Sequence, residues 1–412
     1  MKSSGKPKSL KQLNTRVVLD ILRARDVVSV ADISEAVHLS KTTVKKVLDL
    51  LAAAGIVLSA GKGESTNEGG KKPELYRFNM KYGYSICLHV TPEDLIAVMT
   101  DLRAEISHYQ KATLTEDRSL ERIVGILVET IRSFVAMKAA TGEKLIGLAV
   151  VLPGLVDAVR GVSIYTPHYP NWGRDVPFVD LLRAGLGAGW DLPIFVDNAN
   201  RYQAVAEREK GIAAGRMNFV VIDALNEGLG AGIVLGGEVI QGAQSTSGEI
   251  GHMTLDPYDG FPCICGHKGC FEAMASARRI LVLAREAAGR FPDSPLALAL
   301  ASSSVRLDDV CVAAAQGDPL SLYLIDDVAR WFLVGLGNII MVNDPELIVI
   351  QGAYVKAGSC FLDKLREGIR HIGLPDVEKK VSIEYSRLGE ERGVLGAAAL
   401  MISDFFSQDR FV

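Results

Sequence analysis

The sequence predicts an α/β protein that begins with a small winged helix-turn-helix domain. Three features support this: helical stripes and two short apolar strands within the first 80 residues, regular alternation of strands and helices from Tyr84 onward, and one compact loop rich in cysteine and glycine. Apolar residues at every third or fourth position indicate helices, and short apolar runs between turn residues indicate strands. A chain of 412 residues is too long for a single core, so we expect several domains.

The N-terminal domain should contain three helices. Apolar residues recur at helical spacing over residues 10–23, 32–37 and 41–54. Ser40 is a suitable N-cap for the third helix, because its hydroxyl can accept a hydrogen bond from a free N–H of the first turn. Gly55 should end that helix in the left-handed conformation that glycine adopts readily.

The third predicted helix and the hairpin after it present hydroxyl groups and cations. Strands at 56–58 and 75–78 enclose a polar hairpin, 61–73, which we interpret as the wing. Short hydroxyls and cations at the start of a helix suit contacts with DNA phosphates and base edges. A small helical dimerisation or linker domain is the alternative. We predict DNA contacts from Ser40, Lys41, Thr42, Thr43, Lys45, Lys46, Lys71 and Lys72.

Charge and composition limit the class of protein. Residues 1–80 carry a net charge of +6, whereas the remainder carries 31 basic and 41 acidic residues. A positive head on a negative body favours a head that meets a polyanion. No apolar run approaches the ~20 residues that span a bilayer, and no apolar segment follows the basic N-terminus as a secretory signal requires. Six cysteines, half of them in one loop, favour a reducing cytoplasm.

From Tyr84 the pattern is that of an α/β body. Alternation of this length favours helices packed on sheets. We expect strands at 84–90, 95–100, 145–152, 193–196, 219–222, 232–235 and 347–350, and helices at 119–138, 202–210, 276–288, 307–316, 319–340 and from 393.

The loop between Glu249 and Glu272 predicts a zinc site. Zn²⁺ prefers a tetrahedron of thiolate sulfur and imidazole nitrogen, and four protein ligands leave no open position, so the ion should be structural. Gly266 and Gly269 should let the backbone turn tightly. His267 is a rival nitrogen ligand, and reduced neighbouring cysteines or a redox pair are the alternatives to a metal. The predicted ligands are His252, Cys263, Cys265 and Cys270.

Three motifs carry a family resemblance. They are Pro153-Gly-Leu-Val-Asp157, Gly228-Leu-Gly-Ala-Gly232, and Glu249-x-Gly-His252 followed by Cys263-x-Cys-Gly-x-x-Gly-Cys270-x-Glu272. With these motifs the chain resembles the ROK family (repressors, open reading frames and sugar kinases), in its branch with an N-terminal winged helix. The resemblance implies a two-lobed actin-like fold with a sugar site in the cleft. It also implies domains at 1–80, 81–200 and 201–390, and a helix at 391–412 that returns to the first lobe.

The resemblance also implies sugar-binding residues. Carboxylates and amides can both pair with sugar hydroxyls, usually beside apolar or aromatic walls. The loop of His168, Tyr169, Asn171 and Trp172 lies where the family places a sugar-side loop, and packing is an equal explanation for it. Glu249 and Glu272 have an alternative role as partners of the zinc ligands. The implied sugar contacts are Asn198, Glu249, His252 and Glu272.

The parts that a kinase of this family needs are poorly matched. Its phosphate loop reads Asp-x-Gly-Gly-Thr, whereas residues 89–93 read His-Val-Thr-Pro-Glu, in which proline offers no N–H. Without a gap, Ala199 falls on the position of the general base and Asn198 on the preceding asparagine. A one-gap register would bring Asp197 closer to that role, and the glycine turn 228–232 is retained. We therefore predict no catalytic residue.

These observations together favour a sugar-responsive DNA-binding transcription regulator, a repressor with a structural Zn²⁺. Its expected partners are operator DNA and a sugar or sugar phosphate, with no membrane, and we expect a homodimer or homotetramer. One alternative is a sugar kinase or bifunctional kinase that phosphorylates a hexose or amino sugar with ATP. Another is a vestigial cleft, with the DNA-binding head controlled by a protein or by phosphorylation.

Overall fold

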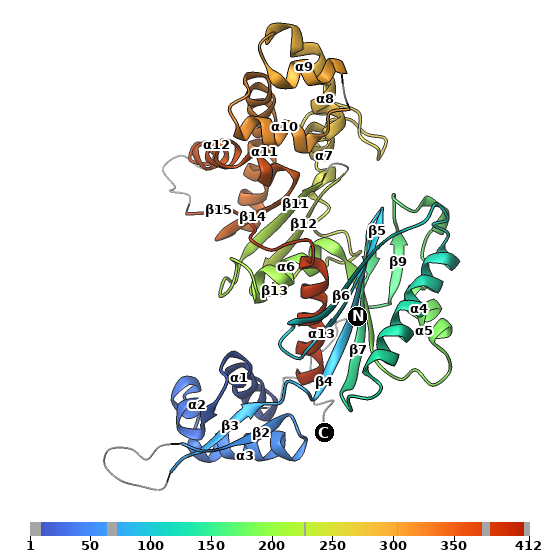
Figure 1. Cartoon of the computed structure of the whole chain (residues 1–412). Helices are drawn as coiled ribbons and strands as arrows, with labels where there is room; N and C mark the ends of the chain where they lie inside the picture. The colour runs from blue at the N-terminus through green and yellow to red at the C-terminus, as the bar shows by residue number, and fades with distance from the viewer. Residues whose placement is uncertain (1–9, 64–71, 226–227, 303, 373–379, 408–412) are drawn as a thin grey trace. The chain divides into compact units, whose positions relative to one another are not determined.

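The computed structural model describes residues 10–63, 72–225, 228–302, 304–372 and 380–407 (Figure 1). The chain forms two compact units. The first takes residues from 1–150, 177–195 and 397–412, and the second takes residues from 151–176 and 196–396. Within the described residues, no helix combines the length and the apolar character that crossing a bilayer requires.

The N-terminal part of the first unit is a winged helix-turn-helix, as the sequence predicts. Its three helices accompany a small antiparallel sheet of order β1-β3-β2, whose first strand lies between α1 and α2 and whose other two strands follow α3 (Figure 1). Gly55 has a φ of +78°, the left-handed conformation expected after the third helix. The elements are α1 (Leu10–Ala24), β1 (Val28–Ser29), α2 (Val30–Val37), α3 (Lys41–Ala53), β2 (Val57–Lys62) and β3 (Glu74–Phe78).

The helix α3 is fixed by its cap and its apolar face. The hydroxyl of Ser40 accepts a hydrogen bond from the N–H of Thr43 at 3.1 Å, which satisfies one otherwise unpaired donor of the first turn. Val44, Leu48 and Leu51 are fully buried against the rest of the domain. The polar face that the sequence predicts to meet DNA is therefore the one left toward solvent.

A second sheet completes the first unit, with strand order β10-β7-β4-β5-β6. The edge strand β6 (Ile106–Thr113) was not predicted, because most of its side chains are polar and exposed and it lacks the apolar pattern of a buried strand. Strands β4 and β5 pair antiparallel. The other elements are β4 (Gly83–Val90), β5 (Asp94–Thr100), α4 (Leu120–Lys138), β7 (Lys144–Leu152), α5 (Phe178–Leu186) and β10 (Ile194–Asn198).

The second unit is built on a sheet of order β13-β12-β11-β14-β15. β14 lies parallel to β11 and β15, and β12 runs antiparallel to β11. A large apolar core packs the long helix α11 and its neighbours against this sheet. Its elements are β8 (Leu155–Asp157), β9 (Val162–Tyr165), η1 (Pro170–Trp172), α6 (Ala199–Glu209), β11 (Phe219–Leu225), β12 (Gly228–Leu235), β13 (Glu238–Val239), η2 (Ile250–His252), α7 (Phe271–Met274), α8 (Ala277–Ala287), η3 (Ala288–Arg290), α9 (Pro295–Ser302), α10 (Leu307–Ala315), α11 (Pro319–Asn343), β14 (Leu347–Gly352), η4 (Ala353–Ala357), α12 (Ser359–Ile369), β15 (Ser382–Tyr385) and α13 (Arg392–Ser407), which ends in the first unit.

The glycines of residues 228–232 lie in a strand, so their interpretation as a turn was wrong. They belong to β12 and pair with β11 along its length. A Cβ at Gly230 would collide with the side chain of Asn200, and one at Gly232 with the Asn200 backbone. These glycines therefore let α6 pack closely over the strand, which is a structural use that sequence spacing alone does not distinguish from a turn.

Candidate metal centre and effector site

A short helix and a tight turn bring the proposed zinc ligands together. The helix η2 ends at His252, and the next segment runs beside the turn, with Leu255 N–H donating to Gly269 O at 2.7 Å. Gly269 has a φ of +65°, and a Cβ there would collide with the backbone of Asp256. Only glycine fits this approach, which supports the reason for which the sequence analysis singled out Gly269. Cys270 then serves as the N-cap residue of α7.

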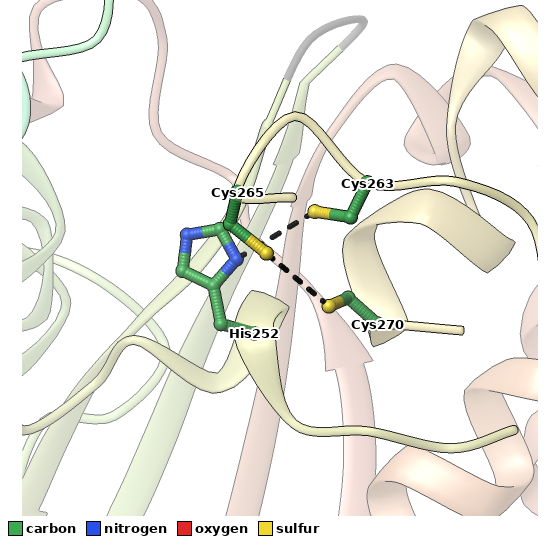
Figure 2. Close-up of side chains that lie close together, drawn as sticks. All are labelled: His252, Cys263, Cys265 and Cys270. Atoms are coloured by element: carbon green, nitrogen blue, oxygen red, sulfur yellow. Dashed lines mark hydrogen bonds between the residues drawn. The ribbon is translucent and has the colours of Figure 1, made fainter. Parts of the chain in front are cut away.

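The four predicted ligand atoms form one group (Figure 2). The three sulfurs and a nitrogen of His252 all lie within 4.8 Å of one another. Cys263 Sγ lies 3.8 Å from His252 Nδ1, and Cys265 Sγ lies 3.6 Å from Cys270 Sγ. Bond lengths of about 2.3 Å for Zn–S and 2.0 Å for Zn–N correspond to tetrahedron edges of about 3.5–3.8 Å. The donor set and its spacing therefore fit Zn²⁺.

The surroundings favour the thiolate that a metal requires at one ligand. Burial opposes ionisation of Cys265, but hydrogen bonds from the His267 backbone and the neighbouring thiols lower its pKa to about 6. His267 itself lies outside the four-atom group, with its Nδ1 3.5 Å from Cys265 Sγ. It therefore lies beside the candidate metal centre, and His252 supplies the nitrogen of the four-atom group.

Three of the predicted sugar contacts belong to the candidate metal centre or lie near it. Glu272 has one oxygen 3.6 Å from Cys263 Sγ, and the other accepts from the N–H of Leu229 at 3.3 Å. Glu249 precedes η2, and burial raises the pKa of its carboxyl, an effect that His252 and Arg201 oppose and Glu272 reinforces. The His252 nitrogen beside Cys263 is Nδ1, so a metal held there would leave the other ring nitrogen for a second partner.

Asn198, the fourth predicted sugar contact, caps α6. Its Oδ1 accepts from the N–H of Asn200 at 2.8 Å, and its Nδ2 donates to the carbonyl of Gly154. Gly154 belongs to the first of the motifs that the sequence analysis identified. The side chain thus ties that motif to the start of α6, a structural role that sequence reasoning did not anticipate.

Arg201 is a central residue of this region that sequence reasoning missed. It is 3% exposed and lies one helical turn after Asp197, to which its Nε donates at 2.6 Å. Its other nitrogens donate to the carbonyls of Val156 at 2.6 Å and Ser245 at 3.3 Å. The spacing of Asp197 and Arg201, i and i+4 across a helix start, was the available signal.

The loop at 168–172 is mainly a packing element. Tyr169 and Trp172 are 2% and 5% exposed, and their rings stack with centroids 4.5 Å apart. His168 is half-buried and Asn171 is exposed.

Two features of the structure bear on kinase chemistry. Ala199, at the base position of the gapless register, is the first residue of α6, and the carboxylate of Asp197 is held by Arg201. Residues 91–93 form the turn between β4 and β5, where Thr91 Oγ1 accepts from the N–H of Glu93 and of Asp94. These N–H groups are therefore used inside the turn.

The predicted DNA contacts differ in their surroundings. Ser40, Lys41, Thr42, Lys46 and Lys72 are exposed, Thr43 is half-buried, and Lys71 lies outside the described residues.

Lys45 is held within the domain itself. Its ammonium lies 2.6 Å from Asp49 and 2.8 Å from the hydroxyl of Tyr76, and these hydrogen bonds raise its pKa. The positive charge of Lys45 is therefore already partly neutralised within the domain by Asp49.

The model of the ROK family matches residues 85–404, which include every residue proposed for the metal and for the sugar. The chain belongs to the ROK family. Its two-lobed, actin-like α/β fold is that of the family's solved structures, in agreement with the fold predicted from the sequence.

Relatives of the chain include regulators and kinases. The xylose repressor of Bacillus spizizenii is 27% identical over 396 residues, which cover 96% of each protein. A glucokinase of Halalkalibacterium halodurans is 34% identical over 258 residues, covering 62% of this chain and 76% of that protein. A crystal structure of a ROK family transcriptional regulator, described as a homologue of E. coli MLC, matches with a TM-score of 0.81 and 26% identity over 97% of both chains.

Proposed function

We propose that this protein is a sugar-responsive transcriptional repressor that binds operator DNA through its winged helix and a sugar beside its metal centre. The observation that supports this best is the extent of the alignments. The chain aligns over 96% of its length with a xylose repressor, which includes the N-terminal domain, whereas the alignment with the glucokinase covers 62% of it. A winged helix reads a short half-site, so two copies reading a symmetric operator fit this proposal, as a homodimer or homotetramer.

The metal has a structural role in this proposal. Zn²⁺ held by His252, Cys263, Cys265 and Cys270 has a full set of protein ligands, and a closed site orients side chains without taking part in chemistry. The ion would fix the turn from which Glu272 projects, and would fix the ring of His252 through Nδ1. Both side chains would then present polar atoms to a sugar with little loss of conformational freedom.

The sugar would be recognised by hydrogen bonds from Asn198, Glu249, His252 and Glu272. Carboxylate oxygens accept from hydroxyls, while the amide and the imidazole can donate. Binding can shift a repressor between its states only through a difference in affinity for them, so the sugar must fit one arrangement better than the other.

The site geometry also argues for the absence of sugar phosphorylation. A general base must reach the hydroxyl that it deprotonates; in the register without a gap an alanine stands at the base position, and Asp197, the candidate in the one-gap register, is bound by an arginine. The turn at 91–93 contains proline, and its neighbouring N–H groups already have acceptors in the chain. Neither segment supplies the phosphate contacts that phosphoryl transfer uses.

A gel shift with the DNA upstream of its own gene, with and without a panel of sugars, tests the proposal. We expect one or more sugars to change the affinity of the full-length protein for that DNA. In parallel, a coupled assay should detect no release of ADP with the same sugars. If the protein instead turns over ATP steadily and Asp197→Asn abolishes this activity, the protein is a sugar kinase and this proposal is wrong.

A further inference from the structure

The groups beside the candidate sugar site carry a consistent pattern of charge. Three thiolates and one imidazole on Zn²⁺ have a net charge of one negative unit. Glu272 contacts this centre at Cys263, and Glu249 lies close enough to Glu272 for the two carboxyls to repel each other. The metal side of the site therefore presents negative charge and hydrogen-bond acceptors.

Arg201, which acts on the Glu249 carboxyl, and Arg160 are both bound by carboxylates. Arg201 uses all three of its nitrogens, on Asp197 and on the carbonyls of Val156 and Ser245. Arg160 pairs with Asp157 at 2.6 Å. An arginine recognises phosphate through two parallel N–H groups, and in Arg201 each nitrogen already donates to the protein.

Two N–H groups at the start of α6 are already used within the chain. A helix N-terminus normally favours an anion because its first N–H groups lack partners. Here the N–H of Asn198 donates to Asp197 at 2.7 Å, and that of Asn200 donates to Asn198 at 2.8 Å. A carboxylate and an amide of the chain thus take the place that a phosphate would use.

One buried hydroxyl beside Asn198 suits a hydroxylic ligand. Thr166 is 1% exposed, and its Oγ1 has no hydrogen-bond partner among the described residues. It packs against Gly154, whose carbonyl accepts from Asn198. A buried hydroxyl without a partner is costly, and a sugar hydroxyl could both accept from it and donate to it.

We propose that the effector is an uncharged sugar and that the site rejects the corresponding sugar phosphate. This rests on the proposed function, since it concerns the same residues. A phosphate next to Glu249 and the metal centre would be repelled by their negative charge. It would also lose hydrating water molecules, and these acceptor groups could not replace the hydrogen bonds that the water donated. Uncharged hydroxyl groups are not repelled, and they can donate hydrogen bonds to these acceptors.

Calorimetric titration of the full-length, zinc-loaded protein tests this with matched pairs. The probes are D-xylose, D-glucose and N-acetyl-D-glucosamine, each beside its phosphate ester. We expect at least one uncharged sugar to bind, with its ester weaker on the order of 100-fold. 6-O-Methyl-D-glucose adds bulk without charge, and where glucose binds it should bind better than glucose 6-phosphate.

Two variants sharpen the result. Glu249→Gln removes one charge, and should narrow the difference between sugar and ester on the order of tenfold without loss of zinc. Glu238→Gln, an exposed carboxylate on β13, should leave the difference unchanged. The electrostatic proposal fails if a phosphate ester binds as well as its sugar, or if the methyl ether binds as weakly as the ester. Either result would leave the proposed function intact. Binding by none of the probes, charged or uncharged, would remove the proposed function as well.

Discussion

Cys265 is the exposed thiol of the candidate metal centre, and its substitution tests whether this group holds zinc. Cys265→Ser removes one of four predicted ligands and should weaken zinc binding by at least about 100-fold. Loss of a residue that only hydrogen-bonds to a ligand already lowers metal affinity by up to about 100-fold. Competition with a chelator, followed by metal analysis, measures this. Cys360→Ser, at a half-buried thiol on α12 outside the ligand group, is the control. Full zinc retention in Cys265→Ser would contradict the proposed ligand set.

At the scale of elements, the helix α3 offers a comparison of its own lysines. Lys41→Ala and Lys46→Ala should each weaken DNA binding, because phosphate contacts release counterions, and each should lower the slope of log affinity against log salt by about 0.9. Lys45→Ala should have a smaller effect, because its ammonium is already paired with Asp49 and Tyr76. Titrations of DNA at several salt concentrations provide the slopes.

Arg285→Ala is the matched control for these lysine variants, since it removes one exposed positive charge from α8 in the second unit. It should leave the salt slope unchanged. Equal slopes for all the lysine variants and the control would mean that α3 does not meet the phosphates.

The start of α11 depends on one buried carboxylate. Asp318 is 7% exposed and accepts hydrogen bonds from the hydroxyl of Ser294 and from the N–H groups of Ser321 and Leu296. Burial raises its pKa, but these donors outweigh burial, so the pKa lies below its usual value. Asp318→Ala should reduce the stability of the second unit by about 2 kcal/mol near neutral pH.

The pH dependence of this loss follows from the lowered pKa. A carboxyl with a depressed folded pKa stabilises fully above its unfolded pKa of about 3.9 and loses this contribution as pH falls through the folded value. The difference between wild type and Asp318→Ala in urea unfolding should therefore be full near neutral pH and shrink only below about pH 4. Asp318→Asn keeps one acceptor and should lose less. A difference that grows on acidification would contradict the assignment.

The elements show what the sequence could predict. Strands such as Lys144–Leu152 and helices such as Leu120–Lys138 follow from apolar periodicity, and the grouping of the four candidate metal ligands follows from residue type and spacing. The exposed edge strand β6 lacks that periodicity, so it was missed. Arg201 was missed for another reason: its importance lies in contacts with Val156 and Ser245, 45 and 44 residues away in the chain, which no local pattern encodes.

At the scale of the whole molecule, α13 is one of the elements that both units share. It begins in the second unit, where Arg392 lies 3.4 Å from the buried Asp223, and it ends in the first. There the ring of Phe406 packs edge-on against Phe78 of β3, with centroids 6.0 Å apart. β3 belongs to the winged helix, so the end of α13 contacts the domain proposed to bind DNA.

Phe406→Ala should therefore weaken the response of DNA binding to sugar while leaving sugar affinity intact. Removing the ring takes away a contact by which a change in α13 reaches β3, and coupling of this kind typically alters affinity about 5–150-fold. The measurement is the ratio of DNA affinities with and without saturating sugar, which should fall toward one. Leu13→Ala, at a side chain on α1 that is 52% exposed, should keep the wild-type ratio. An unchanged ratio in Phe406→Ala would show that the signal reaches the winged helix by another contact.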